Sequence, residues 1–456
     1  KRVVFSGLLF YLFKSRIFRK GVITLPVIQG PSSYKLTGHL QKFRENPLGF
    51  LENLTQYGEI ATFRVAHKRF YVTRDPQLIK DVVITNNKAF QKIKLTHMFK
   101  TLLGEEMLWT DEALYMSPIQ PSQIKQHLTY NKEAIAKIIE KHTETWEEGQ
   151  LRMIVKDIRQ IVVAVLLQLV FGISIQDKDK IHYVQALMRK KEKLGKIYIR
   201  LPLHQPDSDE QLEQLLFERV QMRVQNKTEG KDLLQYILNS CGEDIDEREI
   251  YQQLNSIFLS MYEMITHVCS WSIYLLSQNT REHLQLHKEI QAYASGESLS
   301  TKNLTYMRKI IAESMRLYPP LWLFGRQARE DIQIDGYSIK KGEIMLISPY
   351  MMHRHEDYFL EPSEFLPDRF EKGGSIDVPS YMYMPLGIDH QAERGMDYIT
   401  EIVTIFLSEM TKRFLFQLTK PESIAPMAGV MLNMKEELNV KNLILQHGSK
   451  RVTSNQ

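Results

Sequence analysis

The stretch YMPLGIDHQAERGMDY, residues 383–398, gathers charged side chains just before a long apolar helix that we expect to open at Gly395. Asp389, His390 and Glu393 are residue types that bind metal ions or carry out acid–base chemistry. Two ligands on a loop, His390 and Glu393, are a weak metal site, and we expect no metal there. The simpler hypothesis is a solvated charged loop.

A second group of charges lies in ESMRLYPP, where Glu313 and Arg316 are three residues apart on a predicted helix. Side chains at this spacing face each other, so the two can form an ion pair. Apolar residues surround them in the sequence, which favours a buried pair that fixes a later segment. Arg369 in FLPDRF is the candidate third member.

The segment 256–279 predicts a helix that is apolar nearly all round and therefore runs through the core. It carries one acid, Glu263, which is a weak candidate for acid–base catalysis. Met261 and Met264 lie three residues apart on the same helix. Methionine fills irregular gaps well, so this pair is a candidate for filling space.

The bulk composition of the 456 residues is that of an ordinary globular protein, with 43% hydrophobic and 25% charged residues. A net charge of +5 predicts no nucleic-acid partner. The two cysteines, Cys241 and Cys269, follow no disulfide or zinc spacing, which favours a reducing, cytoplasmic location. The sequence contains no GxGxxG, P-loop, HExxH or nucleophile-elbow motif.

The first residues, KRVVFSGLLFYLFKSRIFRK, place an apolar run between basic clusters. The run from Val3 to Phe13 is shorter than the roughly 20 residues that span a bilayer. Two interpretations stay open: residues 1–20 make peripheral contact with a membrane, or they form an ordinary first helix. We expect residues 1–24 to be a separate segment and 25–456 to be a single domain.

The pattern along the chain predicts a mostly α, α+β fold. Two short strands should flank a turn at Ala66–Arg69, and Asp75 should cap a helix that begins at Pro76. Residues 123–290 are almost wholly helical in pattern, with Gly172 ending a buried helix. Short strands return after residue 330, and the C-terminal part predicts a further hairpin.

These motifs resemble the cytochrome P450 family, whose members are haem-thiolate monooxygenases. Glu313-x-x-Arg316, GRQAREDIQIDGYSIKKG with Arg326, HRHEDYFLEPSEFLPDRF and a loop opening an apolar helix agree with the family in order and spacing. The resemblance extends from DPQLIKDVV to the C-terminal GVML. It implies a helix-rich, triangular single domain with small sheets, which encloses haem b.

The haem loop of the family has the form Phe-x-x-Gly-x-Arg-x-Cys-x-Gly, in which the cysteine thiolate binds iron. The corresponding positions of this chain are Leu386, Asp389, Gln391, Glu393 and Gly395. Four of the five are changed, and the ligand position holds Glu393. Both cysteines lie more than 120 residues upstream, so neither is expected to replace the ligand.

Other family haem positions are lost as well. The stretch 101–124, which should hold the propionates, contains no Lys, Arg or His, and Pro118 would break its helix. On the core helix the family's Ala/Gly-Gly-x-Asp/Glu-Thr-Thr becomes residues 260–265, SMYEMI, so the proton-delivery hydroxyl is missing. Arg326 is the one propionate partner left, and Met261 and Met264 replace smaller residues.

We therefore expect a haem-free protein that works by binding, as an auxiliary protein for a biosynthetic partner enzyme of a natural-product pathway. Three alternatives stay open. One is a haem b oxidoreductase, monooxygenase or peroxygenase-like, with an unusual iron ligand and a small hydrophobic substrate. The others are haem-free acid–base catalysis by Glu263 and Glu393, and a binder of a small hydrophobic ligand.

Overall fold

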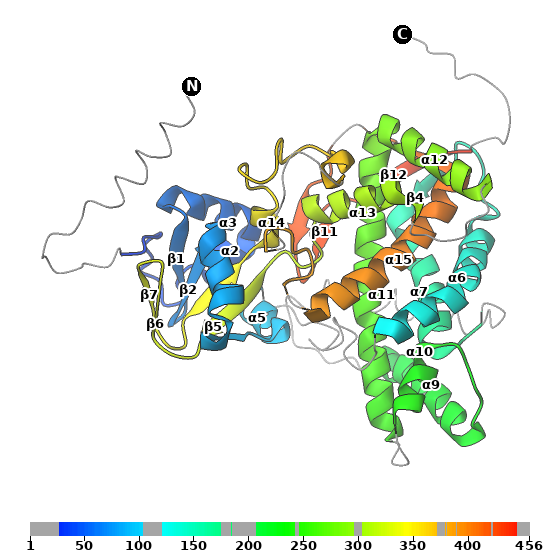
Figure 1. The fold of residues 1–456 in the computed structure, drawn as a ribbon, viewed down its shortest axis with the longest axis horizontal. Coiled ribbons are helices and arrows are strands. Elements are labelled where there is room, and N and C mark those ends of the chain that lie inside the picture. Colours follow the sequence, from blue (N-terminus) through cyan, green and yellow to red (C-terminus); the bar gives the residue numbers. More distant parts are fainter. Residues whose placement is uncertain are drawn as a thin grey trace, which may run out of the picture.

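A small mixed sheet lies beside a larger helical part in the computed structural model (Figure 1). The structure describes residues 27–103, 121–174, 184, 207–241, 246–295, 303–371, 379, 381–388, 390–420 and 423–444. The segment 1–24, the stretch around Pro118 and the C-terminal end lie outside the described residues. Among the helices that the structure describes, none is long and apolar enough to cross a membrane.

The sheet contains five strands in the order β1-β2-β8-β5-β3. Its strands are β1 (Ile60–Val65), β2 (Lys68–Thr73), β3 (Phe90–Lys92), β5 (Phe324–Ala328) and β8 (Ile344–Ile347). The turn between β1 and β2 is shorter than predicted, because Lys68 and Arg69 already pair with Val65 and Arg64. Ala66 takes a positive φ of 51° there, which lets a two-residue connection reverse the chain.

Short helices cover this sheet (Figure 1). They are α2 (Leu40–Glu45), α3 (Pro47–Leu54), α4 (Pro76–Lys80), α5 (Leu95–Leu102) and α14 (Pro349–Met352), with single-turn helices at Thr55–Tyr57, Asp81–Thr85 and Asn87–Ala89. A further single-turn helix, Pro367–Phe370, packs against α13. The predicted cap of α4 is confirmed. The carboxylate of Asp75 accepts hydrogen bonds from the N–H groups of Gln77 and Leu78 at 2.8 and 3.1 Å.

The helical part is built around one long helix, α11. Its helices are α6 (Pro121–Thr143), α7 (Ile154–Phe171), α9 (Asp207–Asn226), α10 (Leu233–Ser240), α11 (Glu247–Gln278), α12 (Thr280–Ser295), α13 (Thr305–Leu317) and α15 (His390–Arg413). Helix α11 is buried along almost its whole second half, as the sequence predicts. Gly172 ends α7 with a φ of 63°, and Asp232 lies so close that a Cβ there would clash.

Small sheets and hairpins close the C-terminal part. They are β4 (Leu151–Met153), β9 (Phe414–Leu418) and β12 (Asn439–Ile444) in one sheet, with the hairpins β6 (Ile332–Ile334)–β7 (Tyr337–Ile339) and β10 (Pro426–Ala428)–β11 (Leu432–Met434). Trp271 of α11 donates its indole N–H to the carbonyl of Leu432, which ties the last hairpin to the core. The predicted mostly α, α+β class is confirmed.

Candidate functional site

Glu313, Arg316 and Arg369 form a buried cluster at the C-terminal half of α13. The carboxylate of Glu313 accepts two hydrogen bonds from the Arg316 guanidinium, at 2.8 and 2.9 Å, and one from Arg369 at 2.9 Å. The backbone N–H of Leu366 completes the set at 2.9 Å. Glu313 and Arg316 are both fully buried. A carboxylate satisfied in this way holds two guanidinium groups in fixed positions.

The two arginines fix the segment that follows α14. Arg316 donates to the carbonyl oxygens of His353, Pro362 and Glu364, at 2.7 to 3.0 Å. Arg369 donates to those of Leu360 and Glu361 at 2.7 and 3.3 Å. The cluster therefore supplies the backbone partners of a segment that has no helix or strand of its own.

His353 connects this cluster to the loop before α15. Its Nδ1 lies 3.1 Å from the carbonyl oxygen of Arg316, and its Nε2 lies 2.9 Å from the backbone nitrogen of Met384. Burial lowers the pKa of His353 to about 3, with Arg316 adding to the effect. Tyr383 donates to the carbonyl of Ala312 at 3.0 Å. Sequence reasoning missed His353, because a His-Arg pair inside a turn-rich stretch gives no signal of burial.

The ligand position does not lie in a loop. Helix α15 begins at His390, so Gln391 and Glu393 belong to its first turn. The prediction that the helix opens at Gly395 and that 389–394 form a loop is wrong for residues 390–394. The physical reason is local: Gln, Ala, Glu and Arg are strong helix formers, and the glycine that the family has at position 389 is absent.

The structure describes only some of the other positions that correspond to the family's haem loop. Leu386 is buried at 1% exposure, and Gly395 is buried inside the helix. Gly387, which directly follows Leu386, takes a φ of 92°, so the chain makes a sharp turn shortly before α15. Asp389 and the side chains of Gln391 and Glu393 lie outside what the structure describes.

Helix α11 places Met261 and Met264 in the core, at 3% and 2% exposure. Glu263 lies between them in sequence and is only partly buried. The hydroxyl of Ser260 donates to the carbonyl of Ile257, within the helix, at 2.9 Å. The structure thus puts two apolar thioethers on the helix, while its one acid in this stretch stays near solvent.

Arg326 lies on β5, paired with Met345 of β8 and Lys92 of β3. Its guanidinium donates to the carbonyl of Gly325 at 3.2 Å and stands 5.1 Å from the ring centre of Phe324. It is half-buried. In this structure the guanidinium contacts its own strand.

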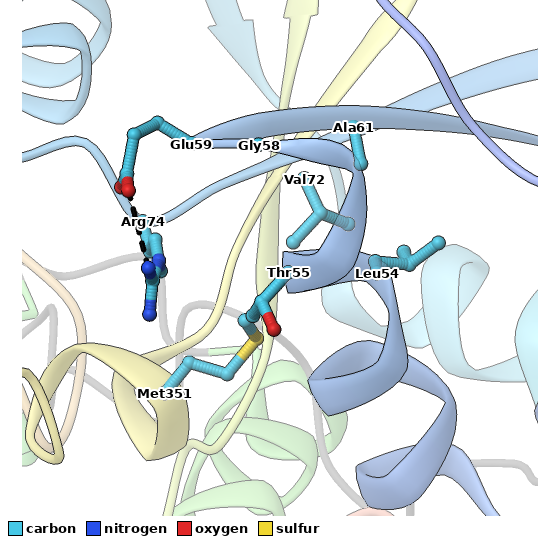
Figure 2. Close-up of a pocket in the computed structure, with 8 residues that line it drawn as sticks. All are labelled: Leu54, Thr55, Gly58, Glu59, Ala61, Val72, Arg74 and Met351. Carbon is cyan, nitrogen blue, oxygen red and sulfur yellow. Dashed lines mark hydrogen bonds and ion pairs between the residues drawn. The ribbon is translucent and has the colours of Figure 1, made fainter.

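Two surface hollows lie near the sheet, and neither is lined by residues of α11 or α15. One has room for about one water molecule and is lined by Leu54, Thr55, Gly58, Glu59, Ala61, Val72, Arg74 and Met351 (Figure 2). A larger one, of about 760 Å³ and open to solvent, adjoins it and shares Glu59 and Arg74. Within the described residues, no group of three or more His, Cys, Asp and Glu side chains is placed to bind a metal ion.

Comparison with known proteins agrees with this architecture. The family model for cytochrome P450 matches residues 28–436. A cyclooctat-9-en-7-ol 5-monooxygenase of Streptomyces melanosporofaciens is 23% identical over 378 residues, 78% of this chain and 82% of that protein. A pentalenene oxygenase of Streptomyces avermitilis is 21% identical over 87% of this chain and 93% of its own length. A taxane 13-alpha-hydroxylase of Taxus cuspidata is 23% identical over 90% of this chain and 89% of its length. The chain therefore belongs to the cytochrome P450 family.

The donor set at the ligand position does not fit the family's thiolate-bound haem. Position 393 carries a carboxylate, which is a hard oxygen donor and lacks the electron push of a thiolate. Cys269 is fully buried on α11, and burial raises the pKa of its thiol well above the ordinary value. Cys241 lies at the end of α10. Neither cysteine belongs to the segment that leads into α15.

Proposed function

We propose that this chain uses the cytochrome P450 scaffold without haem, as a binding protein that supports a partner enzyme of a biosynthetic pathway. The observation that carries the proposal is the first turn of α15, where Glu393 stands inside a helix at the position of the iron ligand. Thiolate-dependent monooxygenase chemistry has no ligand there. The family's Glu313 cluster is retained, and it is a structural element.

Met261 and Met264 support the same proposal. A scaffold that gives up haem leaves space, and unfilled space costs about 24 cal/mol per Å³. Two buried methionines at positions where the family has smaller residues supply volume at that point. We infer that these side chains occupy part of the region that the family uses for haem.

The second candidate function is a haem b oxidoreductase, monooxygenase or peroxygenase-like, with an oxygen ligand from Glu393 and a small hydrophobic substrate. The relatives favour it, since the similar proteins named above are a monooxygenase, an oxygenase and a hydroxylase. Glu263 also keeps an acid on α11. In this alternative the protein supplies an unusual ligand, and the Glu313 cluster supports the loop next to it.

We also propose that the protein is cytoplasmic with peripheral contact to a membrane through residues 1–20. The described residues nearest to that segment support this. Val27, Tyr34 and Leu36 are 85%, 100% and 92% exposed, which is unusual for large apolar side chains within ten residues. Binding of the full chain to anionic vesicles, compared with a Leu9→Ser/Phe10→Ser variant and separately with a Tyr34→Ser/Leu36→Ser variant, tests the proposal.

The experiment for the haem-free function is an absorption spectrum after expression with a haem precursor. The protein is measured reduced and with carbon monoxide, as wild type, Glu393→Ala and Glu393→Cys. We expect no Soret band from any of the three. A wild-type Soret band that Glu393→Ala abolishes would establish the oxidoreductase alternative. A band that appears only in Glu393→Cys would show that the space for haem is still open and that only the iron ligand has been lost.

A further inference from the structure

The segment between α14 and Phe370 presents carboxylates and leucines to solvent on a backbone that is held from inside. We call the following six residues the acidic face: Glu356, Asp357, Leu360, Glu361, Glu364 and Leu366. The four acids are exposed, and the two leucines are 62% and 38% exposed. Exposed apolar residues within a rim of charge are typical of a protein-binding surface.

The arginines of its own segment do not pair with the acids of the face, although Nδ1 of His355 lies 3.9 Å from the carboxylate of Asp357. Arg354 donates to the carbonyl oxygens of Tyr350 and Leu317, and Arg369 donates to Glu313 and to backbone carbonyls. Lys309 is 3.1 Å from Asp368 and 3.4 Å from Glu371, which is why those two acids are not counted in the face. Among the described residues, no lysine or arginine therefore forms an ion pair with the four acids of the face, which leaves them accessible to an outside cation.

The backbone of the face is rigid because the buried cluster holds it. Carbonyl oxygens of Leu360, Glu361 and Glu364 accept hydrogen bonds from Arg316 or Arg369, and the N–H of Leu366 donates to Glu313. Glu361 has a φ of 47°, a conformation that a glutamate adopts only at a cost. Preorganisation of this kind lowers the entropy lost when a partner binds.

A hollow adjoins one end of the face. Glu356 and Asp357 line the solvent-open hollow together with Glu59, Arg74 and Asp75, which flank strands β1 and β2. Its lining holds four carboxylates and two guanidinium groups, an excess of two negative charges. Arg74 is already paired with Glu59 at 3.1 Å (Figure 2), and Arg354 is engaged with backbone carbonyls. The space can accept a cationic side chain next to the face.

We propose that the acidic face is the docking surface for a partner protein that presents lysine or arginine side chains around an apolar contact. The inference rests on the haem-free function proposed above, and it names the partner chemistry of that function. It also explains what the buried Glu313 cluster does without haem: the cluster keeps the face in its binding shape. Complementary charge accelerates association, and the leucines supply the apolar centre of the interface.

The test uses the full chain and a fluorescent 12-residue peptide of alternating lysine and leucine, titrated by anisotropy at low and at physiological salt. The face variant is Glu356→Gln/Asp357→Asn/Glu361→Gln/Glu364→Gln. The matched control removes four exposed acids in and after α6: Glu133→Gln, Glu140→Gln, Glu144→Gln and Glu148→Gln. We expect the face variant to bind about tenfold more weakly and the control to bind as the wild type does.

A third variant, Leu360→Ser/Leu366→Ser, separates apolar docking from charge, and it should weaken binding at physiological salt. Equal weakening by the face variant and its control would overturn the proposal, since the peptide would then follow net charge alone. Sedimentation of the wild type tests whether the acidic face instead binds a second copy of this chain. Self-association that the face variant abolishes would mean that the face binds a second copy of this chain, and it would overturn the proposal of a basic partner protein. A Soret band would overturn the haem-free function without changing any of these binding results.

Discussion

The imidazole of His353 joins the end of α13 to the loop before α15 through Met384. The backbone N–H of Met384 can only donate, so Nε2 of His353 is the acceptor and Nδ1 carries the proton that is given to Arg316. This geometry requires the neutral ring. It also ties the loop to the Glu313 cluster through protein atoms.

The neutral state of His353 predicts a loss of stability in acid. Burial lowers the folded-state pKa to about 3, below the ordinary value of 6.5, so the unfolded chain binds the proton first as the pH falls. Stability is therefore full above pH 6.5 and declines below it. His127, His267 and His283, with pKa values lowered to about 4, 4 and 3, add to the same decline.

The measurement is the free energy of unfolding in urea from pH 5 to 7.5. His353→Gln should reduce the number of protons taken up on unfolding at pH 5 by about one, because one buried neutral histidine is gone. His67→Gln is the control, since His67 is exposed in the folded protein. An unchanged pH dependence in His353→Gln would mean that the ring is not buried and neutral as described.

Removing the charge of Glu313 should be among the most destabilising single changes in this chain. Glu313→Gln leaves Arg316 and Arg369 without their carboxylate in a buried site, and breaking such a pair costs about 3–5 kcal/mol. Glu59→Gln is the control, because its pair with Arg74 is half-exposed and contributes roughly 0–1 kcal/mol. Urea unfolding of both variants measures the difference, and similar small losses would contradict the buried cluster.

Met261 and Met264 should behave as packed core residues. Met261→Ala and Met264→Ala are each expected to lower the free energy of unfolding by about 2–5 kcal/mol, because a cavity remains. Met222→Ala on α9 is the control, since Met222 is 42% exposed and its loss should stay within about 0.5 kcal/mol. Losses below about 1 kcal/mol for both core variants would show that these side chains do not fill space.

The fold and the Glu313 cluster could be predicted from the sequence because their signals are local. The i, i+3 spacing of Glu313 and Arg316, the apolar run of α11 and the Asp75 cap each fix an element within a few residues. His353 could not be predicted, since its burial depends on Met384, which is 31 residues away in the chain.

The first turn of α15 shows how a family pattern can mislead. The pattern assigned residues 389–394 to a loop because the family keeps a glycine and a cysteine there. Gln391 and Glu393 are good helix formers, and nothing in this chain interrupts the helix. The helix propensity of these residues predicts their structure better than the family pattern does. The register of β9 against β12 was beyond sequence reasoning, because Phe414 and Ile444 pair across two inserted strands.

The most direct test of the haem-free account is a titration of the purified full chain with hemin, followed at the Soret wavelength. Serum albumin without its own haem serves as a positive control for the method. We predict a linear rise without saturation, as for free hemin, and no change in the unfolding temperature. A saturable Soret shift at one hemin per chain, weakened by Glu393→Ala, would contradict the account and make Glu393 an iron ligand.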